Sequence, residues 1–228
     1  MPGYPETVPE NPPAAPGSRL PTRLSVEAGI ALEACWSLPD GPGRTVVVLC
    51  HPHPLYGGTM QAPLLRTVAA RLAAAGCPVL RFNFRGVGAS TGSWGGGEAE
   101  IDDVAAAAAA ASAAFPGLSL ALAGWSFGAI VALRWQADTG GCAPFVGIAP
   151  PLASGLSPAL PPPQALAAGR RLFVLGDRDQ FTGVRELEAY AAAAGAAVQV
   201  LPGSDHFFFG RESRVADILA GHFAPAAA

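Results

Sequence analysis

Short apolar runs alternate with longer helix-like stretches through most of this chain, and this alternation constrains the fold more than any other feature. The first pair is Thr45–Cys50, apolar like a strand buried on both faces, and a helical stretch over residues 60–75 that ends at Gly76. Repetition of the unit predicts an α/β protein with a mostly parallel central sheet and helices on both faces. Further strands are expected over residues 78–84, 119–124, 145–149, 172–176 and 198–201, helices over 98–114, 127–137, 184–194 and 212–223, and an antiparallel hairpin over 24–28 and 30–36.

A length of 228 residues suits one such domain preceded by a short tail. Residues 1–22 are rich in proline and have little to bury, so we expect a disordered or loosely docked tail and a folded domain over residues 23–228. The segment over residues 151–169 is short and rich in proline, which leaves no room for a cap domain. We therefore expect an open, shallow site at the carboxyl ends of the strands.

The basic side chains exclude several classes of chemistry. All 14 are Arg, and a chain without Lys cannot supply a Schiff-base amine, a phosphate-loop lysine or a Ser-Lys dyad. The net charge of −3 leaves no basic stripe for nucleic acid or an anionic membrane, so we expect a small-molecule partner. The sequence does not determine the oligomeric state.

The cysteines and the absence of a targeting segment suggest a compartment. The four cysteines are scattered without close pairs, which favours free thiols in a reducing environment. The N-terminal stretch lacks the pattern of a signal peptide, and no apolar run reaches the length of a membrane span. We expect a cytoplasmic protein.

A possible nucleophile lies in Gly124-Trp-Ser126-Phe-Gly128, where an apolar strand is expected to run directly into a helix. Glycines at these positions permit the sharp turn that lifts a serine hydroxyl above the end of a strand. A serine in such a turn can also be idle. The strand-to-helix placement favours a nucleophile.

A serine nucleophile needs an imidazole base, and on this type of fold the base follows the serine and the acid in the chain. His206 comes after the last expected strand and before the last helix. The alternative is His222, which falls on the terminal helix and is better explained as a surface or packed histidine. We favour His206.

The carboxylate that orients the base is less sharply indicated, because Asp177 and Asp179 both follow the strand that ends at Gly176. The acid is third after the glycine in the usual pattern of this loop, which favours Asp179, with Asp177 bonding to its own backbone in a turn. Asp205 is expected to shape its loop, and Asp138 to be solvated.

Two N–H groups should stabilise the negative charge that develops in acyl transfer. One is expected from Phe127, in the first turn of the helix after the serine. The second should come from the loop after Cys50, where proline removes other donors and leaves His53 and Leu55, of which we favour His53. His51 and His53 also resemble a metal pair, but no clustered carboxylate accompanies them, and imidazoles that brace the loop are the better explanation.

Two glycine-rich segments follow the strand that ends at Phe84. Arg85-Gly-Val-Gly88 lacks the full dinucleotide fingerprint, so Arg85 is interpreted as a brace for loops near the site. Residues 92–97 are expected to be a flexible linker. An apolar substrate groove could be lined by aromatic or aliphatic side chains near the strand ends, namely Trp125, Tyr56, Leu55 and Phe207.

Together these segments resemble the α/β-hydrolase superfamily, from about Leu24 to the C-terminus. The resemblance is carried by His51-Pro-His-Pro54, Arg81-Phe-Asn-Phe-Arg-Gly-Val-Gly-Ala-Ser90, the Gly-Trp-Ser126-Phe-Gly turn, Gly176-Asp-Arg-Asp179 and Ser204-Asp-His206-Phe-Phe. Within the superfamily the chain looks like small lidless bacterial hydrolases related to dienelactone hydrolase and carboxylesterases.

The resemblance implies a Ser126, Asp179 and His206 triad and hydrolysis of a small ester or thioester without a cofactor or metal. The chain departs from the family pattern in carrying Asn83 where many members have Asp, and Ser126 where dienelactone hydrolase has Cys. Two alternatives stay open: an aminopeptidase or amidase that uses the same triad, and a non-catalytic ligand-binding protein on the same fold.

Overall fold

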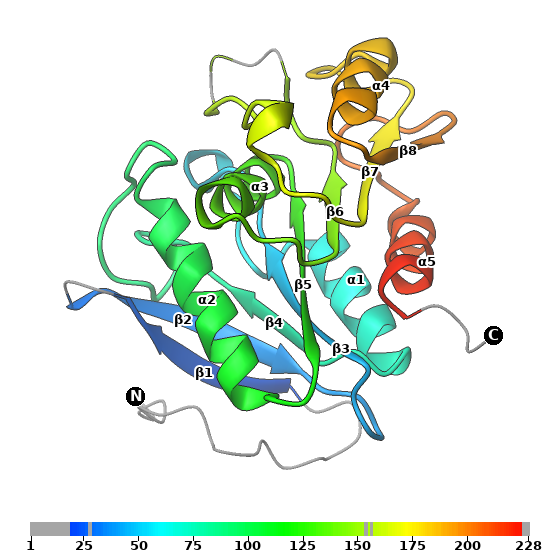
Figure 1. Ribbon diagram of the computed structural model, residues 1–228. Coiled ribbons are helices and arrows are strands. Elements are labelled where there is room, and N and C mark those ends of the chain that lie inside the picture. The colour runs from blue at the N-terminus through cyan, green and yellow to red at the C-terminus, as the bar shows by residue number, and fades with distance from the viewer. Residues whose placement is uncertain (1–18, 27–28, 153–154, 156, 225–228) are drawn as a thin grey trace.

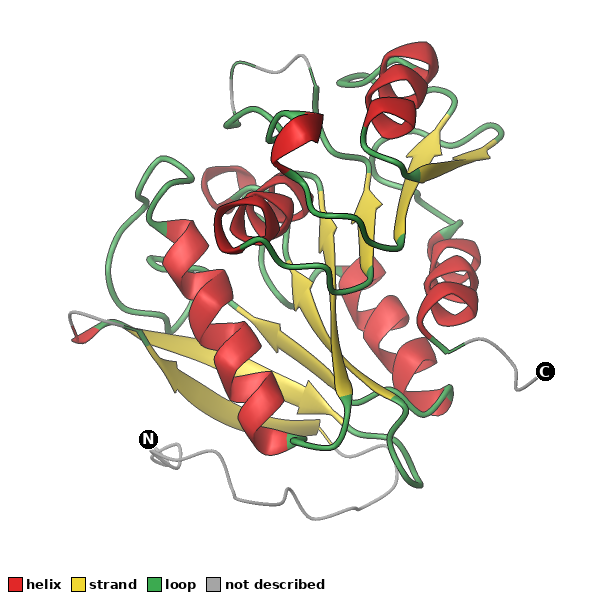
Figure 2. Ribbon diagram, in the orientation of Figure 1, coloured by secondary structure: helices red, strands yellow, loops and turns green. Residues whose placement is uncertain are grey.

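The computed structural model describes residues 19–26, 29–152, 155 and 157–224. These residues form strands and helices in alternation, as the sequence predicts (Figures 1 and 2). The elements are β1 (Arg19–Ser25), β2 (Ala31–Ser37), β3 (Thr45–Cys50), η2 (Pro54–Tyr56), α1 (Pro63–Ala74), β4 (Val79–Phe82), α2 (Glu100–Ala114), β5 (Ser119–Trp125), α3 (Phe127–Thr139), β6 (Phe145–Ile148), η3 (Pro163–Ala165), β7 (Arg171–Gly176), α4 (Val184–Ala193), β8 (Ala197–Leu201) and α5 (Glu212–Phe223).

The strands form one eight-stranded sheet in the order β1-β2-β4-β3-β5-β6-β7-β8. The β1–β2 hairpin is antiparallel, and β2 also pairs antiparallel with β4. All the other neighbours pair in parallel. The expectation of a mostly parallel sheet with an antiparallel hairpin at one edge is confirmed.

Helices cover both faces of this sheet (Figure 1). Helix α1 packs beside α5, and α2 packs beside α3. The central strand β3 is enclosed between these layers, with residues 46–50 fully buried. Burial on both faces explains why this strand has no polar alternation, since each fully buried Val or Leu contributes roughly 1.5–3 kcal/mol.

The described part of the segment over residues 151–169 contains one short turn, η3, and no cap domain. Within the described residues, no helix is both long and apolar enough to cross a membrane.

The predicted boundary between tail and domain was wrong by four residues. Arg19 to Thr22 belong to β1, and the register pairs Arg19 with Ser37 and Thr22 with Ala34. Pairing with β2 overrides the local proline content, because an edge strand can hold Pro21 without losing a bond that the sheet needs. The rest of the predicted tail, residues 1–18, lies outside the described residues.

The loop over residues 92–97 was also predicted wrongly, as a flexible linker. The buried carboxylate of Glu100 accepts hydrogen bonds from Gly95 N at 2.8 Å and Gly97 N at 2.7 Å. Below this loop, Arg85 donates three hydrogen bonds to the buried carboxylate of Asp103 at 2.7–3.0 Å, in keeping with the bracing role expected for it. Two acidic residues in the first turn of α2 therefore hold the chain after β4: Glu100 binds the loop over residues 92–97, and Asp103 binds Arg85.

Candidate active site

Ser126 lies in a sharp turn between β5 and α3. Its φ of 56° and ψ of −121° place a residue other than glycine in a sterically unfavourable conformation. The flanking glycines make the turn possible. A Cβ on Gly124 would overlap the backbone of Gly128, and one on Gly128 would overlap the backbone of Cys50 and His51. The requirement for Gly124 is local to the turn, whereas the requirement for Gly128 comes from the close approach of the end of β3.

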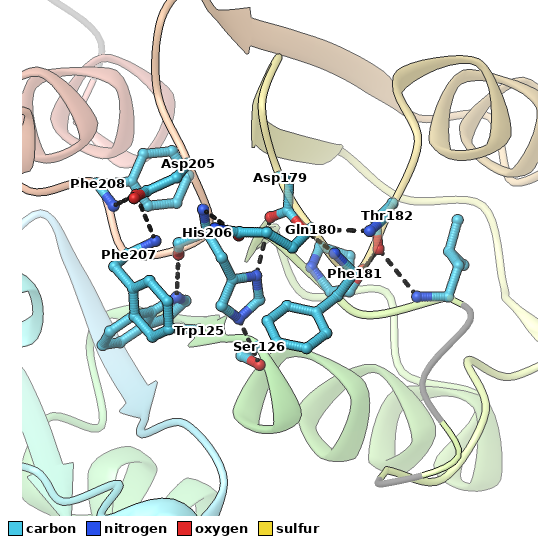
Figure 3. A network of polar contacts seen from close by, with 12 residues as sticks. Trp125, Ser126, Asp179, Gln180, Phe181, Thr182, Asp205, His206, Phe207 and Phe208 are labelled. Carbon is cyan, nitrogen blue, oxygen red and sulfur yellow. Dashed lines mark hydrogen bonds and ion pairs between the residues drawn. The ribbon is translucent and has the colours of Figure 1, made fainter.

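His206 reaches Ser126 from the loop after β8, 80 residues further along the chain (Figure 3). Its Nε2 lies 3.0 Å from Ser126 Oγ. Two hydrogen bonds to the backbone of His206 hold the loop. Trp125 Nε1 donates to the His206 carbonyl at 3.2 Å, and the His206 N–H donates to Gln180 Oε1 at 3.3 Å. The backbone that carries the imidazole is thus held by the end of β5 and by the loop after β7.

Asp179, and not Asp177, contacts His206. Asp179 Oδ2 lies 2.8 Å from His206 Nδ1, and its side chain is fully buried. The other oxygen accepts hydrogen bonds from Phe181 N at 2.8 Å and Thr182 N at 3.1 Å, which set the orientation of the carboxylate.

The prediction that Asp177 bonds to its own backbone was wrong. Asp177 Oδ1 accepts a hydrogen bond from Gly203 N at 2.6 Å, so this carboxylate joins the loop after β7 to the loop after β8. The two loops also touch where a Cβ on Gly176 would overlap the carbonyl of Ser204. Asp205 shapes its loop as expected, by accepting hydrogen bonds from the N–H groups of Phe207 and Phe208.

Of the two residues expected to bind an oxyanion, Phe127 follows Ser126 in the chain and His53 lines the same pocket as Ser126. Phe127 begins α3, so its N–H belongs to the first turn, where backbone donors lack intrahelical acceptors. Of the two candidates in the loop after β3, the N–H of Leu55 donates to His53 Nδ1 at 3.2 Å and is therefore occupied. His53 stays the candidate, and its ring packs against Tyr56, Trp94 and Phe127 at centroid distances of 4.7–5.1 Å.

A pocket of about 610 Å³ opens over Ser126 and His206. This volume lies within the range of small-molecule sites. Trp125, Tyr56 and Phe207 line it as expected. Leu55, also predicted to bind substrate, is 63% exposed and lies outside the lining, so the structure gives this prediction no support.

Sequence reasoning missed several residues of this pocket. Phe181 packs its ring edge against His206 at 4.6 Å, and Phe209 lies at the mouth with 75% of its surface exposed. The run Phe207-Phe-Phe209 in the sequence could have indicated Phe209, because residues two apart in a loop can lie on the same side of the chain as each other. For Phe181 the sequence offers only its position two residues after Asp179. The lining also includes Thr59, Gln61, Ala62, Pro63, Pro151 and Ser157.

Two further histidines, His51 and His222, are not among the residues that line the pocket. His51 is fully buried: its Nδ1 bonds to Pro52 O at 2.6 Å, and its Nε2 accepts from Phe84 N at 3.0 Å, so it braces the loop. Burial lowers the pKa of His51 to about 4. His222 is packed on α5, where burial likewise lowers its pKa to about 4. Asn83 is also structural, accepting from Met60 N and donating to Glu33.

Comparison with known proteins places these features in a family. The model of the family described as serine aminopeptidase, S33, matches residues 41–177, which include Ser126. A curated relative, an uncharacterized protein of Rickettsia prowazekii, is 29% identical over 185 residues, which cover 78% of this chain and 77% of the relative.

Two solved structures are similar over most of the chain. An alpha-beta serine hydrolase homologue from Coxiella burnetii is 30% identical, with a TM-score of 0.78 over 88% of this chain and 95% of that one. An a/b serine hydrolase without a lid from Xanthomonas campestris is 29% identical, with a TM-score of 0.77 over 95% of this chain and 100% of that one. With its eight-stranded, mostly parallel sheet, this chain belongs to the S33 serine aminopeptidase family, within the α/β-hydrolase superfamily of serine hydrolases.

Proposed function

We propose that this protein hydrolyses an apolar ester or thioester through an acyl-enzyme on Ser126. The observation that carries the proposal is the relay from Ser126 Oγ to His206 Nε2 at 3.0 Å and from His206 Nδ1 to Asp179 Oδ2 at 2.8 Å. A nucleophile, a base and an orienting acid within hydrogen-bond distance are the arrangement that acyl transfer needs.

In this mechanism His206 Nε2 takes the proton of Ser126 Oγ as the oxygen attacks the acyl carbon. Asp179 keeps the other proton on Nδ1 and stabilises the imidazolium. The N–H groups of Phe127 and His53 bind the oxyanion of the tetrahedral intermediate. His206 then gives its proton to the departing alcohol or thiol. In the second half of the reaction, water attacks the acyl carbon while His206 takes its proton, and His206 returns the proton to Ser126 Oγ as the acid leaves.

The chemistry of the pocket favours an ester or thioester over the N-terminus of a peptide. An aminopeptidase must bind a free α-ammonium, which is costly to bury without an anionic partner. Among the described residues that line the pocket there is no Asp, Glu or Arg, and the walls are largely aromatic, aliphatic or glycine. A neutral acyl group suits these walls better than a charged amine.

The experiment that tests this proposal is labelling with a fluorophosphonate probe, which reacts with an activated serine whatever the natural substrate. Intact mass and peptide mapping should find a single adduct on Ser126, absent in His206→Ala. Labelling elsewhere, or no labelling of the folded protein, would contradict the proposal and favour a binding protein. A matched set of p-nitrophenyl ester, thioester and aminoacyl-p-nitroanilide substrates then separates esterase from aminopeptidase activity.

A further inference from the structure

Exposed hydrophobic side chains gather around the pocket. Among the described residues the large hydrophobic side chains that are exposed are Leu55, Tyr56, Phe207 and Phe209, with 41–75% of their surface accessible. All four come from the loops after β3 and β8, and the last three also line the pocket. Scattered single apolar residues on a surface need no explanation, whereas a cluster that continues a pocket indicates a ligand.

Three aromatic rings on one side of the pocket form a graded series, here called the ring ladder: Trp125, Phe207 and Phe209. Trp125 and Phe207 meet edge-on at 6.5 Å, and Phe207 stacks on Phe209 at 5.7 Å. Their exposed fractions rise from 8% to 41% to 75%. The ladder therefore leads from the residue next to Ser126 out to the surface.

The backbone between the two phenylalanines is strained in a way that presents both rings on this side. Phe208 has a φ of 55°, which is unusual for a bulky residue, and its side chain is fully buried. Asp205 holds this turn by accepting from the N–H groups of Phe207 and Phe208, and Figure 3 shows Phe207 beside Trp125. Strain of this kind persists where the surrounding structure enforces it, often at binding sites.

The facing wall comes from the loop after β3 and the start of α1. It contributes Pro52, Tyr56, Gly57 and Gly58 to the lining, none of which carries a charge. Thr59 and Gln61 also line the pocket from this segment, so the groove is uncharged and mainly apolar, with a few polar groups among its aromatic, aliphatic and glycine walls. A short acyl group would fill only its inner end and leave the outer rings in water.

We propose that the ring ladder binds an extended apolar chain of the substrate, so that the preferred esters or thioesters carry a medium or long alkyl chain. The proposal rests on the proposed hydrolase function and adds the chemical class of its substrate. The chain can belong to the acyl group or to the alcohol, and the experiment distinguishes the two. Each methylene that becomes fully buried on the ladder should raise kcat/KM by up to about fourfold.

The test compares two ester series, p-nitrophenyl acetate to decanoate and ethyl to decyl acetate, below the concentrations at which they aggregate. Its readout is the ratio of kcat/KM for the longest to the shortest ester of each series. In Phe209→Ala this ratio should fall about tenfold in the series whose chain crosses the ladder, because two or so methylenes lose their contact. Phe209→Leu, which keeps most of the apolar surface, should restore most of the ratio.

Leu55→Ala is the matched control. It removes another exposed apolar side chain, 63% accessible against 75% for Phe209, that lies outside the lining of the pocket, so the ratio should stay as in the unmodified protein. If Leu55→Ala lowers the ratio as much as Phe209→Ala, or if the losses appear only with aggregated esters, the rim docks on a lipid surface and the proposal is overturned. An unchanged ratio in Phe209→Ala also overturns it.

Failure of the underlying function gives a different result. If Ser126 is labelled and short esters are hydrolysed while chain length has no effect in any variant, only the ladder proposal fails. If no ester of either series is hydrolysed and Ser126 takes no label, the hydrolase proposal itself fails.

Discussion

Two loops at the carboxyl ends of strands each bury a histidine, and the partners of the two rings differ. After β3, both ring nitrogens of His51 bond to backbone groups, the carbonyl of Pro52 at 2.6 Å and the N–H of Phe84 at 3.0 Å. After β8, both ring nitrogens of His206 face side chains, those of Asp179 at 2.8 Å and Ser126 at 3.0 Å.

This difference separates a histidine that braces its loop from the histidine that we propose as the general base. Backbone N–H and C=O groups cannot exchange protons with an imidazole, so His51 is held in one neutral tautomer, and burial lowers its pKa to about 4. A carboxylate and a hydroxyl can stabilise a proton and supply one. Burial at a strand end therefore does not make a histidine a base. The chemical nature of the groups bonded to its two ring nitrogens does.

The largest expected effect is on turnover when each histidine is replaced by glutamine. His206→Gln should lower kcat for p-nitrophenyl acetate by about 10⁴-fold, because Gln cannot accept the proton of Ser126. His51→Gln should lower kcat per folded molecule by no more than about tenfold, because His51 contacts no reacting atom. Steady-state kinetics, with circular dichroism to confirm folding, checks both, and equal losses would break the distinction between the two loops.

The next effect distinguishes the two carboxylates of the loop after β7. Asp179→Asn should lower kcat by about 10³-fold, because Asn donates its amide protons and no longer favours the Nδ1–H tautomer of His206. Asp177→Asn is the matched control: its amide oxygen can still accept from Gly203 N, so kcat should stay close to that of the unmodified protein. A larger loss in Asp177→Asn than in Asp179→Asn would assign the orienting acid to Asp177.

The smallest effect is on stability as a function of pH. In the folded protein the pKa of His51 is lowered from about 6.5 to about 4, so between these values the unfolded chain binds a proton that the folded protein does not. The free energy of unfolding should therefore decrease as the pH falls from 6.5 to 4, by about 3 kcal/mol from this residue. Below pH 4 the contribution of His51 to the slope should disappear.

Urea denaturation at several pH values measures this dependence. Because other groups also titrate in the range, the informative quantity is the difference between the unmodified protein and His51→Gln. His51→Gln should be less stable at pH 7 and lose stability less steeply on acidification. Parallel curves for the two proteins would show that His51 is protonated to the same extent in the folded and unfolded states.

Local sequence patterns predicted helices, strands and turns well where residues close in the sequence determine the backbone conformation. Helix α5 begins and ends at the predicted residues, and the glycines on either side of Ser126 predicted the turn that the structure contains. The prediction of the N-terminal boundary was wrong because pairing with β2 stabilises β1, and the proline content does not reveal this pairing. The prediction of a flexible linker over residues 92–97 was wrong because the carboxylate of Glu100 bonds to the backbone of this loop, which its glycine content does not reveal.

The candidate site was likewise predicted in part from local sequence patterns and decided in part by contacts between distant loops. The chain order of Ser126, Asp179 and His206 was visible in the sequence, but the choice between Asp177 and Asp179 depended on a pattern of spacing. The structure places Asp179 against His206 and directs Asp177 to Gly203, because the loops after β7 and β8 pack closely at Gly176. The exclusion of Leu55 and the inclusion of Phe181 and Phe209 also depend on how loops distant in sequence meet.

The sequence by itself determined the alternating strands and helices, the mostly parallel sheet and the sharp turn at Ser126. These follow from side-chain periodicity, glycine positions and helix boundaries, which act over a few residues. Only the tertiary structure decided which carboxylate meets His206, which aromatic rings line the pocket and which backbone groups bond to His51. Those outcomes depend on hydrogen bonds between segments tens of residues apart, whose partners are set by the packing of the whole sheet.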